Sequence, residues 1–297
     1  MAEQVLTPVL QETTLTRRPT RLKRAWHVVR VNPLGAFGAL LILILIIVGL
    51  FAPVLAPHKV DDFVGIPNQG PSASSPFGTD KFGQDILSRV IYGARISLQV
   101  GFISVACGTI LGLIIGAWSG YKGGAVDSVV QRIVDTAIAF PQLLFLLVIV
   151  RVLEPSMRNV ILAIAILIIP SVARIVRSAA LVERSNLYVE AARSTGASDL
   201  RILLRHIVPN VAPIAIVVAT TLLGTAILAE ASLSFLGLGI PPPNPSWGND
   251  ISVARTSFPI NVSAALFPGI AISLTVLGFN LLGDAARDIF DPRLRGR

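Results

Sequence analysis

The residue types that usually carry catalysis are sparse and scattered in this chain. Its three histidines, His27, His58 and His206, lie far apart, and no His-x-x-x-His pair occurs, so a metal site is not expected. The single cysteine, Cys107, lies inside an apolar run, so no disulfide can form within the chain. No Gly-Lys dipeptide and no Gly-x-Ser-x-Gly sequence occurs, which excludes a P-loop and a hydrolase nucleophile elbow. We therefore expect a chain that is not an enzyme and holds no cofactor.

Residues suited to contact with another protein are concentrated in the polar segment 174–206, which lies between two apolar runs. Here Glu-Ala-Ala is followed by a glycine four residues later and by a proline thirteen residues after that glycine, namely Glu190, Ala191, Ala192, Gly196 and Pro209. Glycine tolerates the left-handed conformation that closes a helix. The segment is therefore predicted to form two short helices with a turn at Gly196, a surface that suits a soluble partner.

The second of these helices carries its own start and stop signals. Ser198 is in the position of a helix N-cap, and Asp199 in the first turn complements the helix dipole. An apolar stripe at helical spacing follows, and Pro209 is expected to end the helix before the next apolar run. The stripe consists of Leu200, Leu203, Leu204 and Ile207.

Composition places these elements in a membrane protein. Of 297 residues, 53% are hydrophobic and only 14% are charged, and the mean hydropathy is +0.72. A membrane span needs about 20 largely apolar residues, and six segments qualify or nearly qualify. They predict an all-α protein with six transmembrane helices, at residues 31–56, 96–121, 133–150, 159–173, 207–239 and 256–283.

The net charge of +8 does not indicate nucleic-acid binding, because the basic residues follow the predicted topology. With the N-terminus in the cytoplasm, the cytoplasmic segments hold 18 of the 25 Lys and Arg residues. This bias predicts that both termini are cytoplasmic. No charged residue falls at the centre of a predicted span. Glu230 is expected near the far interface, and Asp135 is expected to pair with Arg132 or to snorkel at the cytoplasmic end of the third span.

Glycines recur at every fourth position of the second span: Gly108, Gly112, Gly116 and Gly120. Four glycines in register form a smooth stripe that allows another helix to approach closely. We expect this stripe to be a helix-packing seam.

The Glu-Ala-Ala pattern with its glycine and proline resembles the EAA loop of ABC importer permeases, and His-Ile-Val-Pro-Asn at 206–210 resembles the variant of this loop in dipeptide and oligopeptide permeases. Phe-Gly-Thr-Asp at 77–80 and the run 83–89 are similar to the C-type subunit of that family, which also includes nickel permeases. In the family, Arg commonly stands at the position of Gln84. Residues 234–239 and the proline-rich run 241–250 also resemble that subunit.

This resemblance implies a type I ABC importer permease without catalytic residues, in a bacterial cell membrane. It implies a homologous second permease, two cytoplasmic ATPase subunits that carry ATP and Mg, and an external solute-binding protein. The implied ATPase contacts are Glu190, Ala191, Ala192, Gly196, Leu200, Leu203, Leu204 and Pro209. For the binding protein we expect contacts at Asp80, Asp85, Trp247 and Asp250, and Trp247 is also a candidate for a membrane-interface anchor.

The expected organisation has five parts. A basic cytoplasmic segment (1–30) precedes an anchor helix (31–57) and an external loop (58–92). A five-helix permease core (93–285) contains the EAA loop (181–209), and a cytoplasmic tail (286–297) follows. A nickel or glutathione permease, an ion-coupled secondary transporter and a non-transporting membrane scaffold remain as alternatives.

Overall fold

The structure, a computed structural model, describes residues 32–258 and 260–290, and their regular secondary structure is helical apart from two isolated β-bridges in the loop 56–85. Five helices are long and apolar enough to cross a membrane, and a bent pair makes up to six. The basic segment 1–30 and the residues after 290 lie outside the described part. The α-helices of eight or more residues are α2 (Pro33–Leu50), α4 (Ile86–Lys122), α5 (Gly124–Ala139), α6 (Gln142–Leu153), α7 (Met157–Arg184), α8 (Leu187–Ser194), α10 (Val208–Phe235), α11 (Trp247–Ala254) and α12 (Ser263–Phe290).

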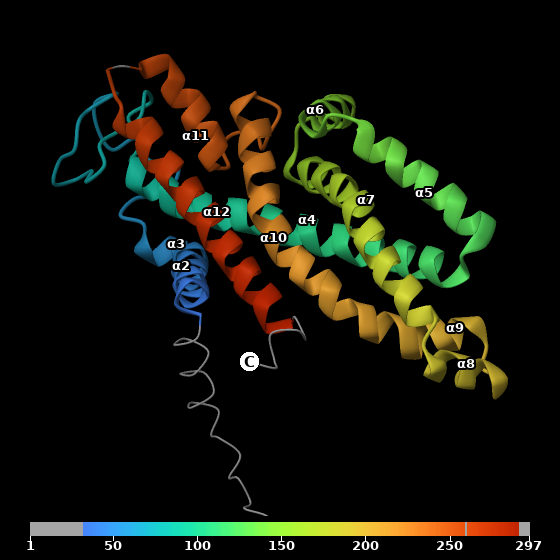
Figure 1. Ribbon diagram of the computed structural model, residues 1–297. Coiled ribbons are helices and arrows are strands. Elements are labelled where there is room, and N and C mark those ends of the chain that lie inside the picture. Colours follow the sequence, from blue (N-terminus) through green and yellow to red (C-terminus); the bar gives the residue numbers. More distant parts are fainter. Residues whose placement is uncertain (1–31, 259, 291–297) are drawn as a thin grey trace, which may run out of the picture.

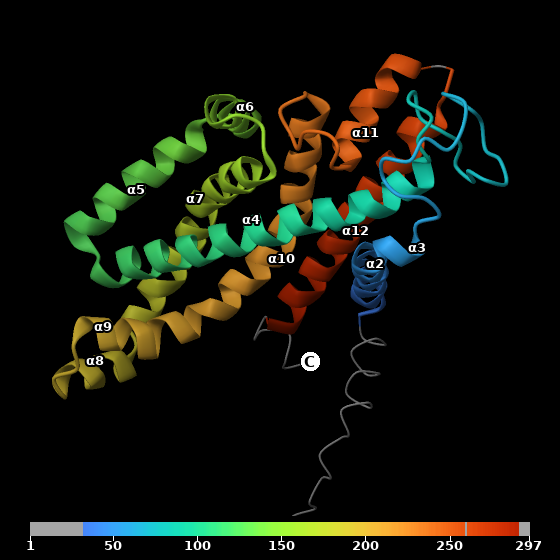
Figure 2. The ribbon, with the colours of Figure 1, turned by 180° about the vertical axis from the view of Figure 1, so that it is seen from behind.

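The longest element, α4, begins ten residues before the predicted second span. Its N-cap is Asp85, whose carboxylate accepts a hydrogen bond from the Ser88 amide at 2.9 Å. Gly123, at φ +67°, ends it. A helix of 37 residues is about 55 Å long, well over the roughly 30 Å of a bilayer core. Figures 1 and 2 show α4 running from the loop 56–85 toward the opposite side of the molecule.

The predicted third span, residues 133–150, is not one helix. The chain bends by 93° between α5 and α6. The cause is Pro141, which lacks a backbone N–H and disfavours helical torsions in the residue before it. Phe140 accordingly has extended torsions, φ −73° and ψ 136°. Asp135 on α5 pairs with Arg174 of α7 rather than with Arg132.

The remaining spans also differ from their predicted limits. α2 begins at Pro33, where Asn32 accepts a bond from the Gly35 amide at 3.1 Å. The short helix α3 (Ala52–Leu55) follows it. α7 continues past residue 173 to Arg184, so the first part of the polar segment belongs to a span helix. α10 and α12 each contain an internal proline, Pro213 and Pro268.

The glycine stripe of α4 forms the predicted packing seam, and its partner is α7 of the same chain. A methyl group added to Gly112 would lie 2.7 Å from Val172 Cβ, and one added to Gly116 would lie 2.4 Å from the Ala173 carbonyl oxygen. A methyl group added to Gly108 would likewise overlap Ile168, and one added to Gly120 would overlap the backbone of Arg177. Because lipid gives helices no hydrophobic reason to associate, close backbone packing of this kind supplies the stability.

We predict that Gly116→Ala lowers the thermal stability of the purified chain in detergent, because the added methyl meets a backbone oxygen that cannot rotate away. Overpacking of this kind costs about 1–3 kcal/mol. The matched control is Gly269→Ala on α12, where the space beside the glycine is open and no loss is expected. An unchanged melting temperature for Gly116→Ala would contradict the seam.

Candidate functional site: the EAA loop and the far end of α4

The turn of the EAA loop (residues 181–209) has the predicted geometry. α8 ends in a Schellman motif: the Ala197 amide donates to the Ala192 carbonyl at 3.1 Å, and the Gly196 amide donates to the Arg193 carbonyl at 3.0 Å. Gly196 has φ +79°, and no atom lies within 4 Å of the place where its Cβ would stand. The glycine is therefore required for its backbone angle and not for space. Ser198 caps the next helix, as predicted.

Pro209 does not end the second helix, contrary to the prediction. The short helix α9 (Asp199–Ile202) continues through a π-helical turn, η1 (Leu203–Ile207), directly into α10. In this turn the Val208 amide donates to the Leu203 carbonyl, five residues back. Pro209 lies directly after this π-helical turn, inside the continuous helix, to which it donates no backbone hydrogen bond.

The apolar stripe predicted on the second helix is divided between two surfaces. Leu203 and Ile207 are buried against the chain, together with Ile202. Leu200 and Leu204 are exposed by 65% and 59%. The face packed on the protein is thus rotated from the predicted one, and two leucines are left on the surface of the loop.

The residues of α8 divide in the same way. Val189 is fully buried and Ala192 packs partly against the core, whereas Glu190 and Ala191 are exposed. Leu187 is exposed by 81%. The EAA loop therefore exposes a mixed surface of apolar, small and charged side chains: Leu187, Glu190, Ala191, Leu200 and Leu204.

A polar contact that the sequence did not reveal ties the loop to the end of α4. Asp199 accepts hydrogen bonds from Tyr121 Oη at 2.7 Å and from Lys122 Nζ at 2.6 Å. Arg193 Nη2 donates to the same tyrosine oxygen at 3.4 Å. The carboxylate and the ammonium group are half exposed, so each bond adds little stability. Together they fix the position of the turn on α4.

Two further contacts hold the base of the loop. Tyr188 Oη donates to Glu183 and accepts from Asn210 Nδ2 at 3.1 Å, which joins the end of α7 to the start of α10. Burial, and then the neighbouring Glu183 carboxylate, raise the pKa of Tyr188, so the phenol remains a neutral donor at pH 7. The second contact is an ion pair between Asp127 of α5 and Arg177 of α7, which holds these two helices together.

The four residues expected to contact a binding protein are all buried at the opposite end, which is formed by residues 56–85 and α11 (Figures 1 and 2). Trp247, only 1% exposed, donates from Nε1 to the Val90 carbonyl at 2.9 Å and packs on Gly93. It is therefore not an interface anchor. Asp85 caps α4, and Asp80 accepts from two amides of its own loop.

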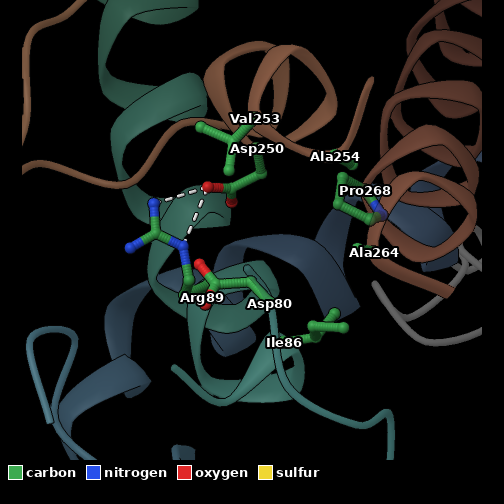
Figure 3. Close-up of a pocket in the computed structure, with 8 residues that line it drawn as sticks. All are labelled: Asp80, Ile86, Arg89, Asp250, Val253, Ala254, Ala264 and Pro268. Atoms are coloured by element: carbon green, nitrogen blue, oxygen red, sulfur yellow. Dashed lines mark hydrogen bonds and ion pairs between the residues drawn. The ribbon is translucent and has the colours of Figure 1, made fainter. Parts of the chain in front are cut away.

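Asp250 of α11 makes the main connection at this end, because it pairs with Arg89 of α4. Arg89 Nε and Nη2 both donate to Asp250 Oδ1, the first at 2.9 Å, and the two side chains are 11% and 8% exposed (Figure 3). Gln84 Oε1 accepts from Arg89 Nη1 at 2.8 Å. A cavity of about 10 Å³ lies beside this pair, next to Asp80. Direct contact of Asp80, Asp85 and Asp250 with a binding protein stays a prediction. In this structure the three carboxylates are buried and accept hydrogen bonds from the same chain.

The surface at this end includes apolar groups that the sequence analysis did not select. Phe63, Ile66 and Ile260 are each exposed by 74% or more. Glu230, expected near this end of its span, does lie in the last turns of α10. It is fully buried and accepts hydrogen bonds from Ser234 at 2.7 Å and Ser97 at 3.2 Å.

Comparison with known families agrees with this arrangement. Residues 108–296, which contain the glycine seam, the EAA loop and α11, match the model of the binding-protein-dependent transport system inner membrane component. The chain belongs to this family. Residues 20–71 match the N-terminal transmembrane domain of oligopeptide transport permease C. The permease is thus a subunit of an ABC importer of the peptide-transporter type and a multi-pass membrane protein.

Relatives of the permease span nearly its whole length. The glutathione transport system permease proteins GsiD of Escherichia coli O6:K15:H31 and of Shigella boydii serotype 4 are each 42% identical over 285 residues, 94% of either chain. Among solved structures, a chain of the MetNI methionine ABC transporter in inward-facing conformations matches with a TM-score of 0.58, at 20% identity, over 69% of the permease and 98% of that chain. At this identity the likeness shows the fold alone.

We predict that substitutions at Gly196 rank by their tolerance of a positive φ. Gly196→Asn should retain solute uptake by the assembled transporter, Gly196→Ala should lower it, and Gly196→Pro should abolish it. Because the space around this glycine is open, differences in side-chain volume would not explain such a ranking. Equal uptake by all three variants would show that the left-handed turn is dispensable.

We also predict that Asp250→Leu destabilises the permease by about 3–5 kcal/mol, because it leaves the Arg89 guanidinium buried without its partner. The double variant Arg89→Met/Asp250→Leu should recover most of the loss, since both charges are then gone. Thermal unfolding of the chain in detergent measures both effects. No recovery in the double variant would argue against direct pairing.

Proposed function

We propose that the permease forms half of a pathway that imports di- or oligopeptides delivered by an external solute-binding protein. The match of residues 20–71 to an oligopeptide permease domain supports a peptide substrate. The relatives named for glutathione transport are compatible with it, because glutathione is itself a short peptide.

The proposed assembly contains a second, homologous permease and two cytoplasmic ATPase subunits, on which ATP and Mg are bound. The permease would lie in a bacterial cell membrane with both termini in the cytoplasm. The location of 18 of the 25 Lys and Arg residues supports this orientation. It places the EAA loop on the ATPase side and the end with α11 on the side of the binding protein.

The observation that carries the coupling role is the exposed surface of the EAA loop. Ala191 is small and exposed, so a partner can approach the α8 backbone closely, and Leu200 and Leu204 offer apolar area beside it. Gly196 sets the angle between α8 and α9. Ala192 and Leu203 pack inward instead, so we assign them to the support of this surface.

The cargo is the part of this function for which alternatives remain. A nickel or glutathione permease differs in its cargo and not in its mechanism. Mass spectrometry of the ligand that co-purifies with the complete transporter would distinguish the cargoes. An ion-coupled secondary transporter is no longer an alternative, because the chain belongs to a family of ABC importer permeases.

We predict that Ala191→Asp leaves the permease folded but abolishes co-purification of the ATPase and solute uptake. A charge forced into a desolvated contact without a partner costs several kcal/mol. Ala191 is a better test than Ala192, where the same change would also disturb the core. The control is Phe63→Ala at the opposite end, which should retain the ATPase. ATPase binding and uptake at wild-type levels in Ala191→Asp would remove the main argument for coupling through this loop.

A further inference from the structure

A groove of about 300 Å³ lies between α6, α7 and α10. Figure 1 shows α6 and α7 on the same side of α10. Its walls are mostly aliphatic, and none of its lining residues is charged. Four polar side chains lie among the apolar ones, from all three helices: Gln142, Ser171, Thr225 and Ser232. An uncharged lining with hydrogen-bonding groups suits a polar but neutral ligand.

The groove offers both donors and acceptors. The Thr225 and Ser232 hydroxyls donate to carbonyls of their own helix, at 2.8 Å each, so their oxygen lone pairs remain free to accept. The donors come from the first turn of α6. Its first helical bond runs from the Phe145 amide to the Pro141 carbonyl, and no side chain caps it, so the amides of Gln142 and Leu143 have no helical partner.

A second hollow of about 380 Å³ continues the groove along α10. The two share Leu143, Leu228 and Ser232 in their walls. The second hollow then reaches Gly248 of α11 and Ile272 of α12. The two adjoining hollows extend from the middle of α10 toward the end of the molecule that carries α11.

Lipid chains are a poor occupant for these hollows. Backbone amides left open by a broken helix are stable at membrane depth only when they are buried in protein or line a water-filled cavity. The break at Pro141 falls within the apolar run 133–150, and the first two residues of α6 after it, Gln142 and Leu143, both line the groove.

We propose that this groove is the permease's half of the solute path and that it binds the neutral amide backbone of the solute, leaving the charged ends unrecognised. The inference rests on the proposed import of peptides. Peptide groups carry one donor and one acceptor each, which matches the open amides of α6 and the hydroxyl oxygens of α10. A lining without charge would also accept peptides that differ in their side chains.

The test uses the complete transporter with a Cys107→Ser permease, which removes the only cysteine. In this background Thr225→Cys and Ser171→Cys are each treated with a membrane-impermeant methanethiosulfonate reagent, with and without trialanine and its binding protein. We expect rapid labelling of both variants, slowed when trialanine is transported. The matched control is Ser273→Cys, at an exposed serine of α12 outside the groove, whose labelling should not respond to trialanine.

Uptake provides the second measurement. Thr225→Val and Gln142→Leu remove a polar group at similar size and should raise the KM for trialanine about three- to tenfold, with ATPase co-purification unchanged. Ser273→Ala should leave the KM as it is. If only lipid-soluble reagents label the Thr225→Cys variant, lipid occupies the groove. If this variant is not labelled but cross-links to the second permease, a helix of that subunit occupies the groove. Either result overturns the proposal.

Failure of the proposed function has a different signature. If the wild-type transporter imports glutathione or Ni²⁺ but not trialanine, the general peptide assignment fails. The labelling of the Thr225→Cys and Ser171→Cys variants is then repeated with the solute that is imported. It tests independently whether the groove is part of the solute path.

Discussion

The structure depends first on the contact between α4 and α7 along the glycine seam. Four glycines of α4 allow the backbones of the two helices to come together without intervening side chains. In a membrane this closeness provides van der Waals contact that apolar side chains, equally solvated by lipid, would not provide. Because α7 leads directly into the EAA loop, the seam also determines where that loop stands relative to α4.

Each end of α4 is then secured by polar contacts of a different kind. At the EAA loop, Asp199 binds Tyr121 and Lys122 through half-exposed bonds that can exchange with water. At the far end, Arg89 and Asp250 form a buried pair that is costly to break. One long helix, α4, therefore connects the weak, half-exposed contacts of Asp199 to the buried Arg89–Asp250 pair. A displacement of the loop would reach α11 through α4 as well as through α7 and α10.

The sequence was sufficient for the features that depend on local chemistry. Gly196 and Ser198 specify a turn and a cap through their own backbone and side-chain preferences, and both are present. The spacing of the seam glycines specified close packing, although it could not identify α7 as the partner. Long apolar runs located the spans, as five long helices and one bent pair, but not their ends, because α4 and α7 extend as helices into polar sequence.

Features that depend on tertiary contacts could not be predicted. The proline-rich sequence around Trp247 and Asp250 suggested an exposed loop, yet both residues lie on α11 and are buried by long-range partners at Gly93 and Arg89. The division of the leucine stripe follows from which side of α9 meets the protein, and nothing in the spacing of the leucines fixes that side. Pro141 was a missed local signal, since a proline inside an apolar run favours a kink or a break, although α7, α10 and α12 continue through Pro170, Pro213 and Pro268.

The π-helical turn before Pro209 has a geometric consequence for the whole of α10. A π turn holds one more residue than an α turn, and one residue corresponds to about 100° of rotation around a helix axis. The turn therefore sets the phase of α10 relative to the EAA loop. Without the extra residue, the side of α10 that carries Thr225 and Ser232 would point about a quarter-turn away from α6 and α7. The direction in which this face of α10 points is thus determined before α10 begins, by the hydrogen-bond register of the five residues Leu203–Ile207.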